Sequence, residues 1–170
     1  NVPELSMQAQ NIPEIIARFD LGAEMDQVED YMHSLVTSPV MAISEPARHV
    51  ISAGGKRLRA LLVLLAARLN HYHPSKVVAV ASAVELIHAA SLVHDDLIDG
   101  ALLRRGAPTL NAEWSPSLTI LTGDYLFART ACLVAETKDV GIMDLFARTL
   151  MIIVNGEIGQ NAAKGYLGRD

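Results

Sequence analysis

Apolar side chains recur through most of the chain every three or four residues, which is the spacing of one face of an α-helix. In the first part of the chain these positions are Ile15, Ile16, Phe19, Met25, Val28, Tyr31, Met32 and Leu35. They predict an amphipathic helix over residues 12–35 that is interrupted near Gly22. Ser38 and Pro39 resemble the cap and first turn of the next helix, which ends before Gly54.

Two further apolar segments predict the centre of the fold. A short helix is expected over residues 61–69, and Pro74 with Ser75 starts a longer helix that stays apolar and alanine-rich through Leu97. A helix without a polar face has to be surrounded by other helices. The long helix is therefore the expected centre of the core.

The last third of the chain continues the helical pattern. A loop is expected over residues 100–109, Ser115 and Pro116 then cap a helix to about residue 136, and a final helix covers residues 142–164. Six helices with short connections predict an all-α antiparallel bundle.

Composition supports a single helical domain. A chain of 170 residues suits one core, and we expect a flexible arm over residues 1–11 followed by one domain over residues 12–170. Apolar residues make up 51% of the chain and aromatic residues only 5%, which favours helix packing over a β-sandwich. The net charge is −5 and basic residues are scattered, which argues against a nucleic-acid groove or a polybasic membrane face.

The chain also lacks the marks of a secreted or membrane-spanning protein. Cys132 is the only cysteine, which excludes an internal disulfide and a cysteine-based zinc site. The longest apolar run, residues 60–67, is well below the ~20 residues that span a bilayer. We therefore expect a soluble, cytoplasmic protein without an integral membrane segment. The chain begins with Asn1 rather than Met, so a removed targeting segment is left open.

Three carboxylates close the long apolar helix. Asp95 and Asp99 lie one turn apart on one face, with Asp96 beside them, and His88 falls within about 20° of Asp95 on the helical wheel. Two carboxylates one turn apart repel each other unless a cation lies between them, and hard oxygen ligands with a diphosphate favour Mg²⁺. The alternative is a solvated helix end, although acidic residues near a helix C-terminus are unfavourable with the helix dipole.

A cluster of basic residues precedes the short apolar helix. Lys56, Arg57 and Arg59 follow two glycines, and positive charge at a helix start opposes the helix dipole. A bound anion would remove this penalty, because backbone donors and cationic side chains would act on it together. The alternative is a solvated basic turn. His71 and His73 lack further ligands nearby and are expected in a surface turn.

Taken together, these motifs resemble a known family. The segment HDDLID followed by LLRRGAPT, residues 94–99 and 102–109, is similar to the first aspartate-rich motif of the trans-isoprenyl diphosphate synthases, or polyprenyl synthetases. GGKRLR at residues 54–59 resembles their basic motif. The similarity continues through GDYLF at residues 123–127 and GEIGQ at residues 156–160. It implies an isoprenoid synthase bundle, a homodimer, and condensation of isopentenyl diphosphate head-to-tail with an allylic prenyl diphosphate.

The resemblance also implies roles for individual residues. The metal ligands would be Asp95, Asp96 and Asp99, holding Mg²⁺ on the allylic diphosphate, with catalysis by Asp95, Asp99 and Arg104, and with Lys56, Arg57, His88, Arg104 and Arg105 binding substrate. Arg104 would hold the allylic diphosphate, and Arg105 that of isopentenyl diphosphate. Mg²⁺-assisted ionisation of the allylic substrate would be followed by attack of the isopentenyl double bond and loss of a proton.

Product length in the resembled family depends on the side chains four and five residues before the first aspartate. Here these are Ser91 and Ala90, which are both small. We therefore expect a product of C20 or longer, with the stopping point set by bulkier residues such as Phe127 or Phe146.

One feature departs from the family. Its second aspartate-rich motif is absent, and the remaining aspartates late in the chain are isolated at Asp124, Asp139, Asp144 and Asp170. The sequence is therefore expected to be the N-terminal half of a longer protein, inactive alone. Two alternatives are a non-catalytic or regulatory subunit of a heteromeric synthase, and a metal-dependent phosphohydrolase that uses His94 with Asp95 but lacks a matching set of further ligands.

Overall fold

The computed structural model describes residues 12–37, 40–53, 55–69 and 73–167, with the side chains of 164–167 left undescribed. The expected arm, the Ser38–Pro39 helix start, Gly54 and His71 lie outside these ranges. The helices are α1 (Ile12–Arg18), α2 (Gly22–Leu35), α3 (Met41–Ser52), α4 (Leu58–Ala67), α5 (Pro74–Ile98), α6 (Leu110–Glu113), α7 (Pro116–Glu136) and α8 (Val140–Leu167). Strands β1 (Leu103–Arg104) and β2 (Ala107–Pro108) pair as an antiparallel hairpin.

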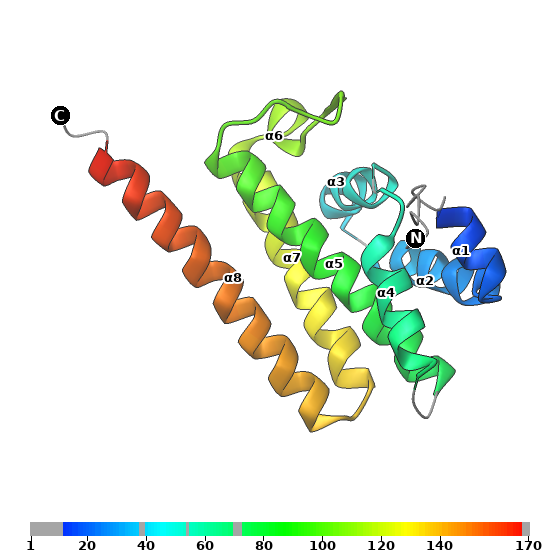
Figure 1. Cartoon of the computed structure of the whole chain (residues 1–170). Helices are drawn as coiled ribbons and strands as arrows, with labels where there is room; N and C mark the ends of the chain where they lie inside the picture. Colours follow the sequence, from blue (N-terminus) through cyan, green and yellow to red (C-terminus); the bar gives the residue numbers. More distant parts are fainter. Residues whose placement is uncertain (1–11, 38–39, 54, 70–72, 168–170) are drawn as a thin grey trace, which may run out of the picture.

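The all-α prediction is confirmed, and the described residues contain two more helices than the six that the pattern predicts. The helix expected over residues 12–35 divides into α1 and α2, because Asp20 adopts a left-handed backbone with φ of 48° just before Gly22. Residues 100–109, expected as a loop, form the hairpin instead, and the four-residue helix α6 follows it. These differences are local and leave the antiparallel bundle in place (Figure 1).

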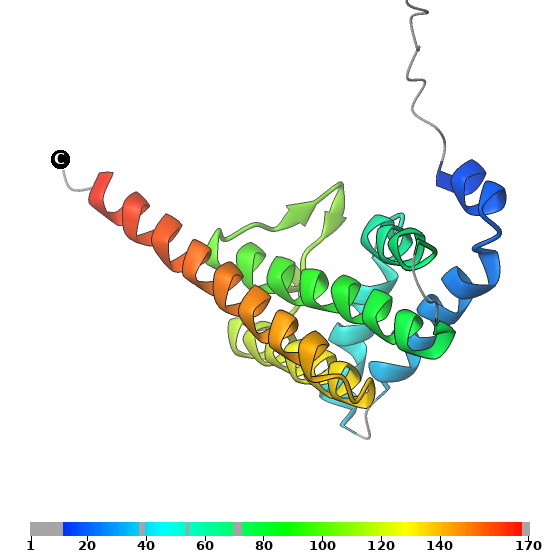
Figure 2. The same cartoon turned by 60° about the horizontal axis from the view of Figure 1, so that its bottom comes forward.

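Helix α5 is the centre of the core, as its apolar sequence predicts. It packs along α7 and is also covered by α4 and α2, as Figures 1 and 2 show. Many of its buried side chains are small, namely Ala79, Ala81, Ser82, Ala83 and Ala90, and small residues let neighbouring backbones approach closely. Both α5 and α7 have the length and hydropathy of membrane-spanning helices, and their central, mutually packed position accounts for that hydropathy within the bundle.

A close contact between α5 and α7 depends on Gly123. A Cβ atom added at this position would overlap the imidazole of His94. The ring cannot move away freely, because its Nε2 lies 3.2 Å from the Ile120 carbonyl oxygen and 3.5 Å from the Asp124 carboxylate. The glycine of the GDYLF segment therefore has a packing role.

We expect Gly123→Ala to lower the free energy of unfolding by about 1 to 3 kcal/mol, the usual cost of overpacking a filled site. Gly156→Ala on α8 is the matched control, because nothing lies within 4 Å of the Cβ it would add, and alanine is the better helix former. Thermal unfolding followed by circular dichroism measures both. An unchanged unfolding midpoint for Gly123→Ala would contradict the packing role.

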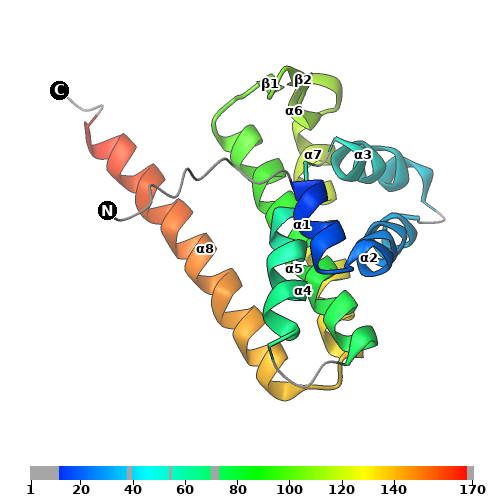
Figure 3. The same ribbon diagram turned by 45° about the vertical axis from the view of Figure 1, so that its right-hand side comes forward.

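Helix α8 is attached less completely than the other long helices. Ile142 and Phe146, near its start, pack against the core, but no α8 side chain from 140 to 163 is fully buried. Large apolar side chains are exposed along its length, including Leu145, Met151, Ile152 and Ile158. Figure 3 shows the C-terminal end of α8 standing apart from the other helices.

Candidate functional site

The three aspartates at the end of α5 occupy three different environments. Asp96 is buried and accepts hydrogen bonds from Arg104, whose Nε lies 2.9 and 3.0 Å from its two carboxylate oxygens. Asp95 is half-buried and lines a cavity against α8, and Asp99 is exposed at the end of the helix. Within the described ranges, no three His, Cys, Asp or Glu side chains converge as a metal site.

Negative charge gathers around Asp95. Its pKa is raised, mainly because burial disfavours the charged form and also because Glu157 on α8 lies nearby, with Asp99 and Asp96 adding to the effect. Arg104 opposes this shift but is itself engaged by Asp96. A divalent cation fits this environment: Mg²⁺ commonly uses one or two carboxylates, retains waters and takes its other ligands from substrate phosphates. Of the three aspartates, Asp95 borders the cavity against α8, and Asp99 follows it by one helical turn.

A first cavity of about 240 Å³ lies between α3, the start of α4, α5 and the hairpin. Its lining includes all the residues expected to bind substrate, namely Lys56, Arg57, His88, Arg104 and Arg105. They come from segments separated by up to about fifty positions of sequence. Positive charge on several sides of one small cavity suits an anion of diphosphate size.

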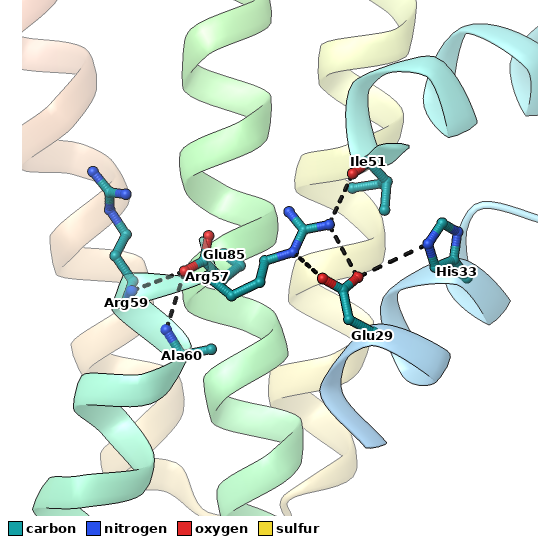
Figure 4. A network of polar contacts seen from close by, with 7 residues as sticks. All are labelled: Glu29, His33, Ile51, Arg57, Arg59, Ala60 and Glu85. Atoms are coloured by element: carbon teal, nitrogen blue, oxygen red, sulfur yellow. Dashed lines mark hydrogen bonds and ion pairs between the residues drawn. The ribbon is translucent and has the colours of Figure 1, made fainter. Parts of the chain in front are cut away.

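Arg57 lines this cavity, but its guanidinium is bonded elsewhere. It donates to both carboxylate oxygens of Glu29 on α2, at 2.6 and 3.0 Å, and to the Ile51 carbonyl oxygen at 2.8 Å (Figure 4). The residue has a left-handed backbone with φ of 47°, and its side chain is only 8% exposed. These contacts tie the turn before α4 to α2 and α3.

Arg59 is a cavity residue that belongs to the predicted basic cluster but is not among the residues to which the family resemblance assigns substrate binding. Figure 4 shows its side chain extending away from that of Arg57, and it lines the first cavity. Its charge contributes to the lowered pKa of His88, for which burial is the larger cause. The sequence feature that could have identified it as a cavity residue is its position two residues after Arg57, on the first turn of α4.

The start of α4 already has an anionic partner within the protein. Glu85 on α5 is buried, and one of its carboxylate oxygens accepts hydrogen bonds from the backbone amides of Arg59 and Ala60, at 2.9 and 3.1 Å. A carboxylate at a helix N-terminus is favoured by the helix dipole. These two amides are therefore used by Glu85, and a ligand in the cavity would be held by the side chains around it.

The hairpin brings Arg105 next to the turn before α4. Arg105 and Gly106 form its tip with φ values of 53° and 82°. A Cβ atom at Gly55 would lie only 2.9 Å from Arg105 Nη1, so the glycine leaves room for the guanidinium. Arg104 remains on Asp96, and this hydrogen bond raises the pKa of Arg104 above its usual value.

A second cavity, of about 490 Å³, lies between α5, α7 and α8. Polar groups gather where Asp95 faces Glu157 and Asn161, and apolar side chains such as Ile153 and Phe127 form much of the remaining lining. Ser91, one turn before Asp95, lines this cavity, whereas Ala90 is fully buried in the core and lines neither cavity. The two aspartates Asp95 and Asp96 thus belong to different cavities.

Comparison with known proteins agrees with this arrangement. The polyprenyl synthetase family profile matches residues 40–166. The component 2 chain of heptaprenyl diphosphate synthase from Geobacillus stearothermophilus is 45% identical over 140 residues, covering 82% of this chain and 44% of the relative. Octaprenyl diphosphate synthase from Haemophilus influenzae is 34% identical over 137 residues, covering 81% and 42%.

Solved structures give the same result. A decaprenyl diphosphate synthase from Rhodobacter capsulatus superimposes with a TM-score of 0.84 at 38% identity, covering 90% of this chain and 47% of that one. A polyprenyl synthase from Caulobacter crescentus, complexed with calcium and isoprenyl diphosphate, gives a TM-score of 0.81 at 36% identity, covering 87% and 44%. The chain spans about half the length of the proteins it matches.

Proposed function

Because the chain belongs to the polyprenyl synthetase family, we propose that the whole protein condenses isopentenyl diphosphate with an allylic prenyl diphosphate to give a polyprenyl diphosphate of C20 or longer. The observation that carries the proposal is the pair of cavities that reach α5 at the neighbouring residues Asp96 and Asp95. One is small and cationic, and the other is larger and apolar with carboxylates at one part of its lining. Two substrates that share a diphosphate but differ in prenyl length need such a pair.

In this proposal the first cavity binds isopentenyl diphosphate. Lys56 and Arg59 line it from the start of α4 and Arg105 from the hairpin, and burial together with nearby positive charge lowers the pKa of His88. Arg57, which the family resemblance also assigns to substrate binding, contributes by holding the turn through Glu29. Cationic side chains that are already in place stabilise the bound diphosphate without a large rearrangement.

The allylic substrate would occupy the second cavity, with its diphosphate near Asp95 and Asp99 and its prenyl chain among the apolar residues. Bound Mg²⁺ would offset the negative charge that develops on the leaving diphosphate. Arg104 lies next to Asp96 and adds positive charge near Asp95. The apolar lining keeps water away from the allylic cation until the isopentenyl double bond attacks it.

We further propose that the whole protein is a cytoplasmic homodimer and that this 170-residue chain alone does not turn over. The support is the exposed apolar surface of α8, together with the finding that this chain spans about half the length of its relatives. The relative from G. stearothermophilus is described as one component of its synthase, so a heteromeric enzyme, with this chain as a non-catalytic or regulatory subunit, is the second candidate. Size-exclusion chromatography with mass determination, alone and with a candidate partner, separates the two.

The arginines of the hairpin provide the functional test. Arg105→Ala is expected to raise the KM for isopentenyl diphosphate about 10- to 100-fold, because a charge-assisted hydrogen bond contributes about 1.5 to 3 kcal/mol. Arg104→Ala is expected instead to impair use of the allylic substrate. Radiolabelled prenyl transfer by the whole protein measures both, with Arg18→Ala on α1 as a control for loss of a remote exposed arginine. Equal effects on both substrates would contradict the assigned roles.

A further inference from the structure

His49 on α3 contacts the segments that follow the two hairpin arginines. Its Nε2 lies 3.2 Å from the carbonyl oxygen of Pro108 in β2, and its Nδ1 lies 3.7 Å from a carboxylate oxygen of Glu113 in α6. Its ring also meets that of Trp114 edge-on, with centroids 5.2 Å apart. One imidazole therefore joins α3 to both ends of the segment that leads out of the hairpin.

The proton on this imidazole follows from its partners. A carbonyl oxygen only accepts hydrogen bonds, so Nε2 carries the hydrogen that Pro108 accepts. A proton on Nδ1 as well would add a hydrogen bond donor facing Glu113. The contact with the hairpin therefore needs only the neutral ring with its hydrogen on Nε2.

The hairpin itself has little packing of its own. All residues from 102 to 108 are exposed. Its base is closed by Thr109, whose hydroxyl donates to the Ala101 carbonyl oxygen at 2.7 Å and whose amide donates to that of Leu102 at 3.1 Å. An exposed two-stranded hairpin is only marginally stable by itself, so its direction depends on contacts with the rest of the protein.

The pairing of the two strands links the His49 contact to the two arginines of the hairpin. Pro108 pairs with Leu103, and Ala107 pairs with Arg104. Fixing Pro108 against α3 therefore fixes β1 and the tip residue Arg105 relative to the basic turn. His49 also lines the first cavity, so the contact between α3 and the hairpin lies at the edge of the proposed site.

We propose that His49 is a positioning residue, which holds the hairpin through the Pro108 carbonyl so that Arg105 stays beside Gly55 and lines the first cavity together with Lys56 and Arg59. This inference rests on the proposed function, because it assigns the isopentenyl diphosphate site to that cavity. His49 acts on the ligand through the hairpin, and its removal weakens binding by leaving Arg105 displaced.

The substitutions separate this role from simple packing. His49→Leu fills the site without a donor, whereas His49→Gln places an amide nitrogen where Nε2 stands. His73→Leu, at the opposite end of α5 and exposed, is the control for removing a histidine. Circular dichroism and thermal unfolding verify that each variant is folded.

The first measurement needs no ligand. Trypsin cleaves after arginine, and a hairpin released from α3 presents Arg104 and Arg105 more often in a cleavable form. We expect the cleavage rate at these residues, followed by mass spectrometry, to rise about tenfold in His49→Leu and to return close to wild type in His49→Gln. Equal cleavage in all folded variants would overturn the proposal, even if isopentenyl diphosphate binds normally.

The second measurement is calorimetric binding of isopentenyl diphosphate, with inorganic pyrophosphate as the prenyl-free probe. We expect Kd to rise about tenfold in His49→Leu, to recover in His49→Gln, and to change little when His49→Leu is added to Arg105→Ala, because both changes remove the same contact. Independent, additive effects would overturn the positioning role. Absence of binding by the whole wild-type protein, with the trypsin pattern as expected, would instead count against the proposed function while supporting the His49 contact.

Discussion

Asp95→Ala is expected to reduce turnover of the whole protein by roughly two orders of magnitude or more while leaving the helices folded. The residue is half-buried, borders the second cavity, and has a raised pKa because of burial and neighbouring carboxylates. Removing it relieves repulsion with Glu157 and so costs little in folding. It also removes a carboxylate that would hold the cation on the leaving diphosphate.

Radiolabelled prenyl transfer and circular dichroism measure the two parts of this expectation. Asp26→Ala, an exposed aspartate on α2, is the matched control for loss of one carboxylate. Asp95→Asn is a second comparison, because it keeps the size of the side chain and removes its charge. Condensation at the wild-type rate by both Asp95 variants would exclude this residue as a metal ligand.

Ser91→Phe is expected to shorten the principal product by at least one five-carbon unit. Ser91 lines the second cavity one turn from Asp95, so an aromatic ring there fills space that additional prenyl units need. The family pattern gives Ala90 and Ser91 the same role in product length, but in the structure the two side chains lie in different environments. Ala90 is fully buried within the core, and we expect Ala90→Phe to cost about 1 to 3 kcal/mol of stability by overpacking.

Chromatography of dephosphorylated products measures chain length, and thermal unfolding measures the cost of each substitution. Ser91→Ala is the control that changes the side chain without filling the cavity. A wild-type product that ends at C15, or an unchanged product from a folded Ser91→Phe variant, would show that Ser91 does not control length.

The parts of this structure that follow from sequence are those set by local periodicity. The apolar run of α5 predicts a surrounded central helix, and the motif at its end groups Asp95, Asp96 and Asp99 as one set of candidate metal ligands. The structure adds the partner of each side chain, namely Arg104 for Asp96 and the cavity against α8 for Asp95. Such partners depend on packing between segments that are distant in the chain. The periodicity of a single helix carries no information about that packing.

The basic turn shows the same limit. In the sequence, the three basic residues Lys56, Arg57 and Arg59 are indistinguishable members of one cationic cluster. Positive charge at the start of α4 suggests that an anionic ligand binds there. In the structure, a left-handed backbone at Arg57 accompanies the pairing of its guanidinium with Glu29, and Glu85 supplies the anion for the backbone amides. Both carboxylates lie more than twenty positions away in sequence, so neither role is visible in the motif itself.

The attachment of α8 has a consequence for the order in which the second cavity forms. Its first turns hold Ile142 and Phe146 against the core, but the cavity residues Ile153 and Glu157 lie further along, where no described α8 side chain is fully buried. Local opening is easiest where few apolar contacts must be broken. A prenyl chain in the second cavity would make apolar contacts with this part of α8. Because it would bind only when α8 is closed over the cavity, its binding would stabilise the closed form by mass action. A growing prenyl chain would thus help to order the part of α8 that encloses it.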